Sequence, residues 1–102
     1  MSRYCFCYFI AGDPAGYARE IDVIRQVCNT DYHEQYELHV IDVLRNPDAV
    51  RRENLLATPV LVQQAPGPQR RIVGNLRNEQ QVREGLLLAS YELDESLHQG
   101  VS

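Results

Sequence analysis

The step from Thr58 to Pro59, which leads directly into the apolar run Val60-Leu61-Val62, constrains the fold of this chain more than any other feature. Proline has no N–H to give to a β-ladder, so Pro59 can lie only at the mouth or edge of a strand. The residue before it is pushed into an extended conformation, and a Thr-Pro bond can be cis at modest cost. The step therefore predicts a strand that starts beside Pro59, at one end of a sheet.

The rest of the chain alternates between short apolar runs and helical patterns. Strands are expected at Tyr4–Ala11, Tyr36–Leu44, Pro59–Gln63 and Gln69–Val73, the last two forming a hairpin around the turn Pro66-Gly67-Pro68. A polar break is expected from Asn29 to Glu34. Asp13 and Asn46, each followed by proline, suit helix N-caps. Helices are expected from Pro14 to Cys28, from Pro47 to about Asn54 and from about Asn78 to Glu95.

This order of elements predicts an α/β fold, a small mixed sheet with flanking helices. A proline at the start of the third strand, after strand, helix and strand, is typical of thioredoxin-like domains, so we expect that architecture. With 102 residues the chain is long enough for one modest core. We expect a single domain over residues 1–102, with its core at about 4–95 and a frayed tail at 96–102.

Composition excludes several classes of function. The formal net charge is −4, whereas nucleic-acid-binding domains usually carry a basic face, so no nucleic-acid partner is expected. No apolar run approaches the length of a membrane span, and the first residues carry no signal-peptide pattern. We therefore expect a cytoplasmic protein without integral membrane association.

The three cysteines fit a reducing compartment better than a disulfide framework. Cys5 and Cys7 alternate along one strand and face the same side of the sheet, but their spacing matches neither a CxxC redox pair nor a zinc knuckle. Burial as small apolar residues is the interpretation we favour for them and for Cys28. A peroxide-reactive thiol at Cys5 or Cys7 stays open as an alternative.

Thiol–disulfide exchange, the obvious chemistry of a thioredoxin-like domain, needs a thiolate at the N-terminus of the first helix. This chain has Gly12-Asp13-Pro14-Ala15-Gly16 there, with neither cysteine nor serine. Asp42 lies in an apolar run and, if buried, needs a hydrogen bond or an ion pair, a structural role. The histidines show no metal-ligand spacing: His33, His39 and His98. We therefore expect no enzymatic activity, no cofactor and no metal site.

Three strings of the sequence carry a resemblance to a known family. They are YELHVIDVLRNP from Tyr36 to Pro47, LLATPVL from Leu55 to Leu61 and PQRRIVGNL from Pro68 to Leu76. In this order they resemble the KaiB family of circadian clock proteins, and the similarity spans about Tyr4 to Glu95.

The resemblance implies a non-enzymatic regulatory protein that binds a KaiC-type ATPase ring and modulates its phosphorylation and ATPase cycle, in circadian or stress regulation. It also implies a homo-oligomer in the free state, a dimer or a tetramer. The residues expected to contact the partner are polar or cationic: Arg19, Arg45, Arg51, Arg52, Asn54, Arg70 and Arg71.

KaiB proteins are metamorphic, so the resemblance implies two folds, the thioredoxin-like fold and the rearranged KaiB ground-state fold as its alternative. Proline and glycine weaken the commitment of the second half to helix or strand. The residues associated with this pliable half are Thr58, Pro59, Pro66, Gly67, Pro68, Gly85 and Leu87. Clock members usually carry aspartate at the position of Leu87, and leucine there favours a helix and the thioredoxin-like form.

Other departures from the family bear on the partner. Glu37 replaces a small residue in the strand that family members use near KaiA, and this argues against a KaiA partnership. Clock members tend to carry lysine at three positions where this chain has His39, Asn54 and Gln63. The alternative function is a redox-inactive thioredoxin-like adaptor that binds another protein or an extended peptide beside Pro59.

Overall fold

A computed structural model of the chain describes residues 3–74 and 76–86. Residues 79–86 are helical. The other elements, in chain order, are β1 (Tyr4–Ile10), a short 3₁₀ helix η1 (Pro14–Tyr17), α1 (Ala18–Tyr32), β2 (Tyr36–Asp42), α2 (Pro47–Arg52), β3 (Val60–Ala65) and β4 (Arg70–Val73).

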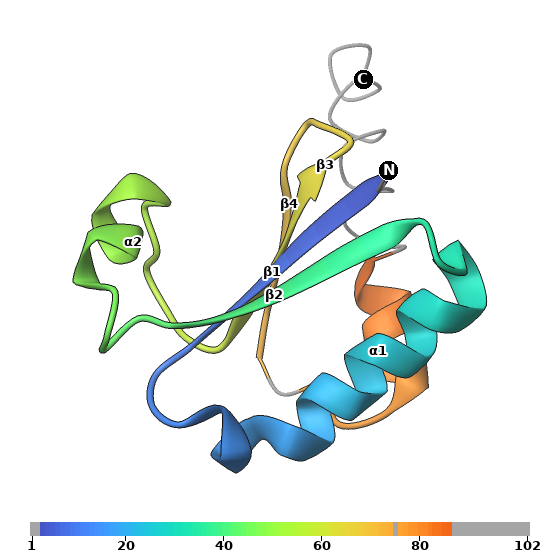
Figure 1. Cartoon of the computed structure of the whole chain (residues 1–102), viewed down its shortest axis with the longest axis horizontal. Coiled ribbons are helices and arrows are strands. Elements are labelled where there is room, and N and C mark those ends of the chain that lie inside the picture. Colours follow the sequence, from blue (N-terminus) through green and yellow to red (C-terminus); the bar gives the residue numbers. More distant parts are fainter. Residues whose placement is uncertain (1–2, 75, 87–102) are drawn as a thin grey trace, which may run out of the picture.

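The four strands form one mixed sheet in the order β2-β1-β3-β4 (Figure 1). β1 and β2 run parallel, in register from Tyr4 opposite Tyr36 to Ile10 opposite Asp42. β3 is antiparallel to both β1 and β4, so β3 and β4 form the predicted hairpin. Pro59 immediately precedes β3, at the mouth of that strand, as predicted. The α/β thioredoxin-like architecture predicted from the sequence is confirmed.

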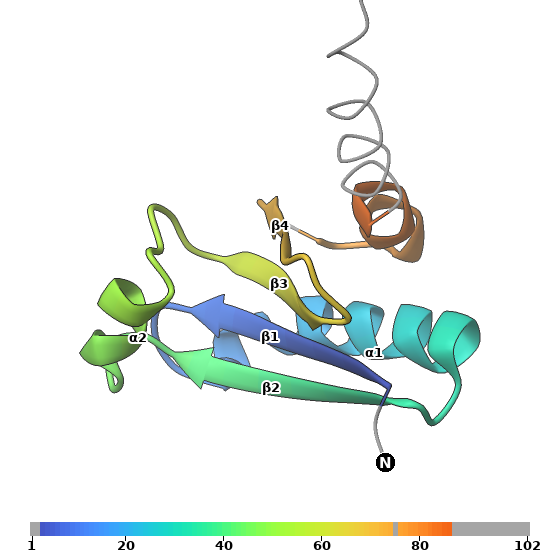
Figure 2. The same ribbon diagram turned by 90° about the horizontal axis from the view of Figure 1, so that it is seen from above.

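Each face of the sheet has its own apolar core. α1 runs along the sheet, and α2 lies at the end to which β1 and β2 point (Figure 2). On one face, alternate residues of β1 pack against α1 and the helical segment 79–86, burying Phe6, Tyr8, Ile10, Ile24, Val27, Cys28, Leu61, Leu76, Val82 and Leu86. On the other face a smaller cluster lies beneath α2, formed by Cys7, Phe9, Val43, Ala49, Leu55, Val60 and Val62. The short α2 leaves the start of β1 and β2 on its own face less covered, since Cys5 is only half-buried and Glu37 is exposed.

Several predicted element ends were wrong. α1 continues to Tyr32 through most of the expected polar break, because the Tyr32 ring packs against Tyr4 and Phe6. The helix ends where His33 adopts a φ of 56°. The helical stretch predicted after Asp13 begins as the 3₁₀ helix η1, whereas α1 itself starts at Ala18 and runs four residues beyond Cys28.

Asp13 caps η1 as expected, accepting a hydrogen bond from the Ala15 N–H at 2.9 Å. Asn46 occupies the N-cap position of α2, with Pro47 next to it in the first turn, as predicted. Its side chain does not bond to the N-terminus of the helix and instead donates to the carbonyl oxygen of Asp42 at 2.9 Å. α2 ends at Arg52, because Asn54 adopts a φ of 53° that is incompatible with a continuing helix.

The predicted last helix is described only over 79–86, so its continuation to Glu95, Leu87 and the tail lie outside the described residues. Gly85 lies against β4, where a Cβ atom would come within 3.0 Å of the Ile72 side chain. Arg83 ties this segment to α1 through two bonds to the Asp31 carboxylate, at 2.9 and 3.0 Å. Among the helices that the structure describes, none is both long and apolar enough to cross a bilayer.

Candidate functional site

The position of the reactive thiol in redox thioredoxins is occupied here by a polar turn and η1. Each of the three cysteines is a free thiol elsewhere in the fold. Burial raises the pKa of Cys7 to about 11 and that of Cys28 to about 12, which disfavours the thiolate form at neutral pH. Both thiols therefore behave as small apolar groups.

Asp42 organises the loops at the carboxyl ends of β1 and β2. One oxygen of its carboxylate, Oδ1, accepts hydrogen bonds from the Gly12 N–H at 2.9 Å and the Leu44 N–H at 3.0 Å. Arg45 Nε lies 3.8 Å from the other oxygen. This largely buried acid therefore has a structural role, as the sequence predicted. It fixes the turn after β2, in which the Leu44 side chain is exposed to solvent.

A mixed apolar and cationic surface surrounds α2 at this end of the sheet. Leu56 is 94 % exposed, Leu44 71 % and Val73 63 %, which are high values for large apolar side chains. A cleft of about 140 Å³ lies between the segment after α2 and β4. We call this surface the docking end, formed by Leu44, Arg45, Arg51, Arg52, Asn54, Leu55, Leu56, Ala57, Val60, Arg71 and Val73.

The docking end contains five of the seven partner-contact residues expected from the sequence. Arg71 donates to the carbonyl oxygens of Glu53 and Asn54, which ties β4 to the end of α2. Arg51 pairs with Asp48 at 2.8 Å, and Arg52 is exposed in the last turn of α2.

The other two expected residues lie on different elements or faces. Arg19 is exposed in the first turn of α1. Arg70 neighbours Arg71 on β4, so the two side chains point to opposite faces. Ile72 packs against the core on the α1 side, and Arg70 lies two residues before it on β4, so Arg70 points to that side too.

The residues associated with a pliable second half lie mainly at the ends of β3 and in the β3–β4 turn. The Thr58–Pro59, Ala65–Pro66 and Gly67–Pro68 peptide bonds are cis. Gly85 lies instead in the helical segment against β4. The described structure has a helix at 79–86, which agrees with the thioredoxin-like form.

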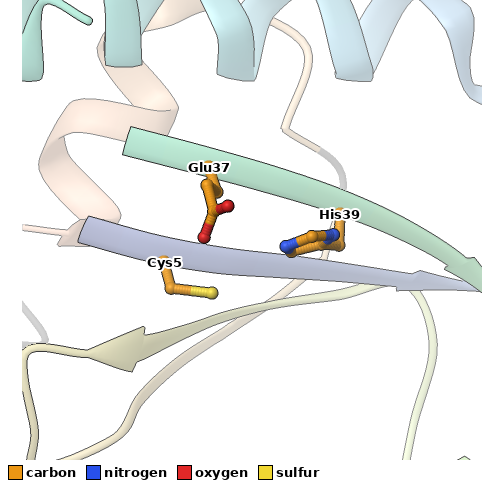
Figure 3. A group of neighbouring side chains, drawn as sticks. All are labelled: Cys5, Glu37 and His39. Atoms are coloured by element: carbon orange, nitrogen blue, oxygen red, sulfur yellow. The ribbon is translucent and has the colours of Figure 1, made fainter. Parts of the chain in front are cut away.

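Sequence reasoning missed two features. The exposure of apolar side chains at the docking end depends on how loops pack, although two adjacent leucines, Leu55 and Leu56, were visible three residues before Pro59. The second feature is a cluster of Cys5, Glu37 and His39, whose ligand atoms all lie within 4.8 Å of one another (Figure 3). Spacing along the chain did not reveal this cluster, because it depends on the register between β1 and β2.

The fold and the docking end together define a class of protein: a thioredoxin-like domain without the redox thiol, carrying an exposed apolar and cationic surface. The sequence matches the KaiB domain family over residues 7–88, and the chain belongs to the KaiB family.

Relatives extend over most of the chain. The circadian clock oscillator protein KaiB of Prochlorococcus marinus (strain SARG) is 39 % identical over 93 residues, which cover 91 % of this chain and 80 % of that protein. The protein of the same name from Synechococcus elongatus strain PCC 7942 is 34 % identical over 93 residues, covering 91 % of each.

Solved structures agree on the fold. The N-terminal domain of Synechococcus elongatus SasA superposes with a TM-score of 0.67 at 18 % identity, covering 92 % of this chain and 87 % of that domain. Chloroplastic thioredoxin z superposes with a TM-score of 0.59 at 24 % identity, covering 88 % and 80 %. These likenesses show the thioredoxin-like fold alone.

Proposed function

We propose that this protein is a non-enzymatic clock-type regulator that binds a KaiC-type ATPase ring through the docking end and modulates its phosphorylation and ATPase cycle. The family membership supports this role, since the relatives are named circadian clock oscillator proteins. The observation that carries the choice of surface is the exposure of Leu44, Leu56 and Val73 among arginines. Protein interfaces combine apolar anchors with arginine in this way.

The arrangement of the docking end supports this proposal further. Asp42 and Arg71 hold its loops through hydrogen bonds to backbone groups, so the apolar side chains are presented from an ordered frame. A preordered surface loses less conformational entropy when a partner binds. Arg45 and Arg51 each lie beside an acidic side chain, so their charges are partly offset. Arg52, exposed in the last turn of α2, supplies positive charge for an acidic partner surface.

The test is binding of the purified protein to a KaiC-type hexamer, with and without nucleotide, for the wild type and for Leu56→Glu. The Leu56 side chain is 94 % exposed, so the substitution leaves the fold intact. Truncation of a central anchor costs about 2 kcal/mol or more, so we expect at least about 30-fold weaker binding. Gln26→Glu, an exposed site on α1, adds the same charge and is the matched control. Unchanged binding by Leu56→Glu would show that the docking end is not part of the interface.

Arg19→Glu tests whether the surface extends to α1, since Arg19 is exposed in the first turn of that helix. The proposal does not include KaiA as a partner, and it includes a free homo-oligomer, which light scattering on the same sample measures. Backbone chemical shifts test the choice of fold, because strand-type shifts across Val82 to Leu88 would contradict the thioredoxin-like form.

A second candidate is a redox-inactive adaptor that binds an extended peptide. The cleft of about 140 Å³ favours it, because Leu55 and Val60, the residue after Pro59, both line that cleft. An apolar peptide that binds while the ATPase does not would favour the adaptor.

A further inference from the structure

Four side chains that can act as metal ligands occupy one patch at the start of the parallel pair β1–β2. The register places Cys5 opposite Glu37 and Cys7 opposite His39. Residues two apart on a strand share a face, so all four lie on the face opposite α1. Figure 3 shows Cys5 from β1 beside Glu37 and His39 from β2.

The distances are close to those of a first coordination shell. One ligand atom from each of Cys5, Glu37 and His39 lies within 4.8 Å of the others. Ligands at about 2.0–2.3 Å from a tetrahedral ion are roughly 3.3–3.8 Å apart. The necessary contraction of about 1 Å is within the reach of side-chain rotation, because Glu37 and His39 are exposed and only Cys5 is half-buried.

We propose that Cys5 Sγ, a Glu37 carboxylate oxygen and a His39 ring nitrogen bind one divalent zinc ion, with the fourth position open to water. Sulfur, nitrogen and oxygen donors in one set suit Zn²⁺, which is borderline in softness and tetrahedral. Hard ions such as Mg²⁺ prefer oxygen ligands only, so this donor set disfavours them. The Glu37 carboxylate and the Cys5 thiolate together balance the ion's charge.

Cys7, buried two residues further along β1 on the same face and opposite His39, is the thiol next to the three proposed ligands.

Binding converts the Cys5 thiol to a zinc-bound thiolate and releases its proton to solvent. Thiolate ligands bind metal ions in their deprotonated form, so metal binding at such a site is accompanied by proton release.

The experiment is a titration of the reduced, chelator-treated full-length protein with Zn²⁺ in competition with a chromophoric chelator, under anaerobic conditions. Co²⁺ in a parallel titration reports sulfur ligation through its sulfur-to-metal charge-transfer band and tetrahedral geometry through intense visible bands. We expect one ion per chain, a cobalt spectrum with one sulfur ligand, and a rise in Tm with Zn²⁺ because the ion binds the native state.

Variants identify the ligands. Cys5→Ser, Glu37→Gln and His39→Gln should each weaken Zn²⁺ binding by at least about tenfold, since even partners of ligands matter that much. Cys28→Ala and His33→Gln are the controls, a buried thiol on the other face and an exposed histidine before β2. Circular dichroism confirms that each variant folds. Absence of the charge-transfer band, or its survival in Cys5→Ser, overturns the proposal, as does an equal loss of affinity in a control variant.

Discussion

Removing the Asp42 carboxylate tests the architecture of the docking end most directly. Its Oδ1 atom holds two backbone N–H groups, one from the loop after β1 at Gly12 and one from the turn after β2 at Leu44. The Asp42 side chain is only 10 % exposed. Replacing it by alanine therefore removes the acceptor of both bonds.

The expected cost follows from those two bonds. A hydrogen bond to a charged group contributes about 1.5–3 kcal/mol, but Leu44 is exposed and its N–H can turn to water. Asp42→Ala should therefore lower the free energy of unfolding by about 2–4 kcal/mol in total. Asp42→Asn keeps an oxygen acceptor and loses the charge and the loose Arg45 pair, so about 0.5–1.5 kcal/mol is expected.

Urea unfolding followed by circular dichroism measures these values, with unchanged m-values as the check on two-state behaviour. For a domain of this size, Asp42→Ala should lower Tm by about 10–20 °C. Asp22→Ala, an exposed site on α1, should stay within about 0.5 kcal/mol of the wild type. The reasoning is wrong if Asp42→Asn costs as much as Asp42→Ala, because the loss would then not reflect the missing acceptor.

Two further stability measurements concern the α1 face of the sheet. Gly85→Ala gains about 1 kcal/mol of helix propensity but places its Cβ 3.0 Å from Ile72, and overpacking costs about 1–3 kcal/mol, so we expect a net loss in urea unfolding. A clear gain would contradict the close contact. Burial raises the pKa of Cys28 from 9.0 to about 12, so the unfolded chain ionises first and the free energy of unfolding falls as pH rises between those values. Cys28→Ala should make that fall shallower, and an unchanged slope would contradict burial as its cause.

Periodicity was enough to predict the strands and the core face of α1. The aromatic and apolar run of β1 and the helical spacing of Ile24 and Cys28 identify residues that are in fact buried. The end of α1 depended instead on a tertiary contact, because Tyr32 packs on the rings of Tyr4 and Phe6. Helical periodicity contains no information about such contacts, so the predicted helix stopped early.

The candidate sites were predictable only in part, for a similar reason. An aspartate in an apolar run indicated that Asp42 needs a partner, but the partners are N–H groups, and one of them is 30 residues away in the chain. The cluster around Cys5 depends on the parallel register that sets Cys5 opposite Glu37 and Cys7 opposite His39. Local sequence spacing cannot supply a register between strands separated by a helix.

The two proposed sites lie at opposite ends of the same parallel pair of strands. Cys5 and Glu37 form the second pair of the β1–β2 ladder, whereas Ile10 and Asp42 form its last pair. Five residues of strand separate the ends by about 16 Å, too far for a ligand at one end to touch a partner at the other. An ion at the start of the β1–β2 ladder can nevertheless stabilise the strand pairing that positions the Asp42 turn. The reason is that β1 and β2 must remain in register along the whole ladder. Metal binding should therefore affect partner binding only by stabilising the folded state. Under conditions where the protein is already fully folded, the affinity for the partner should not depend on the metal ion.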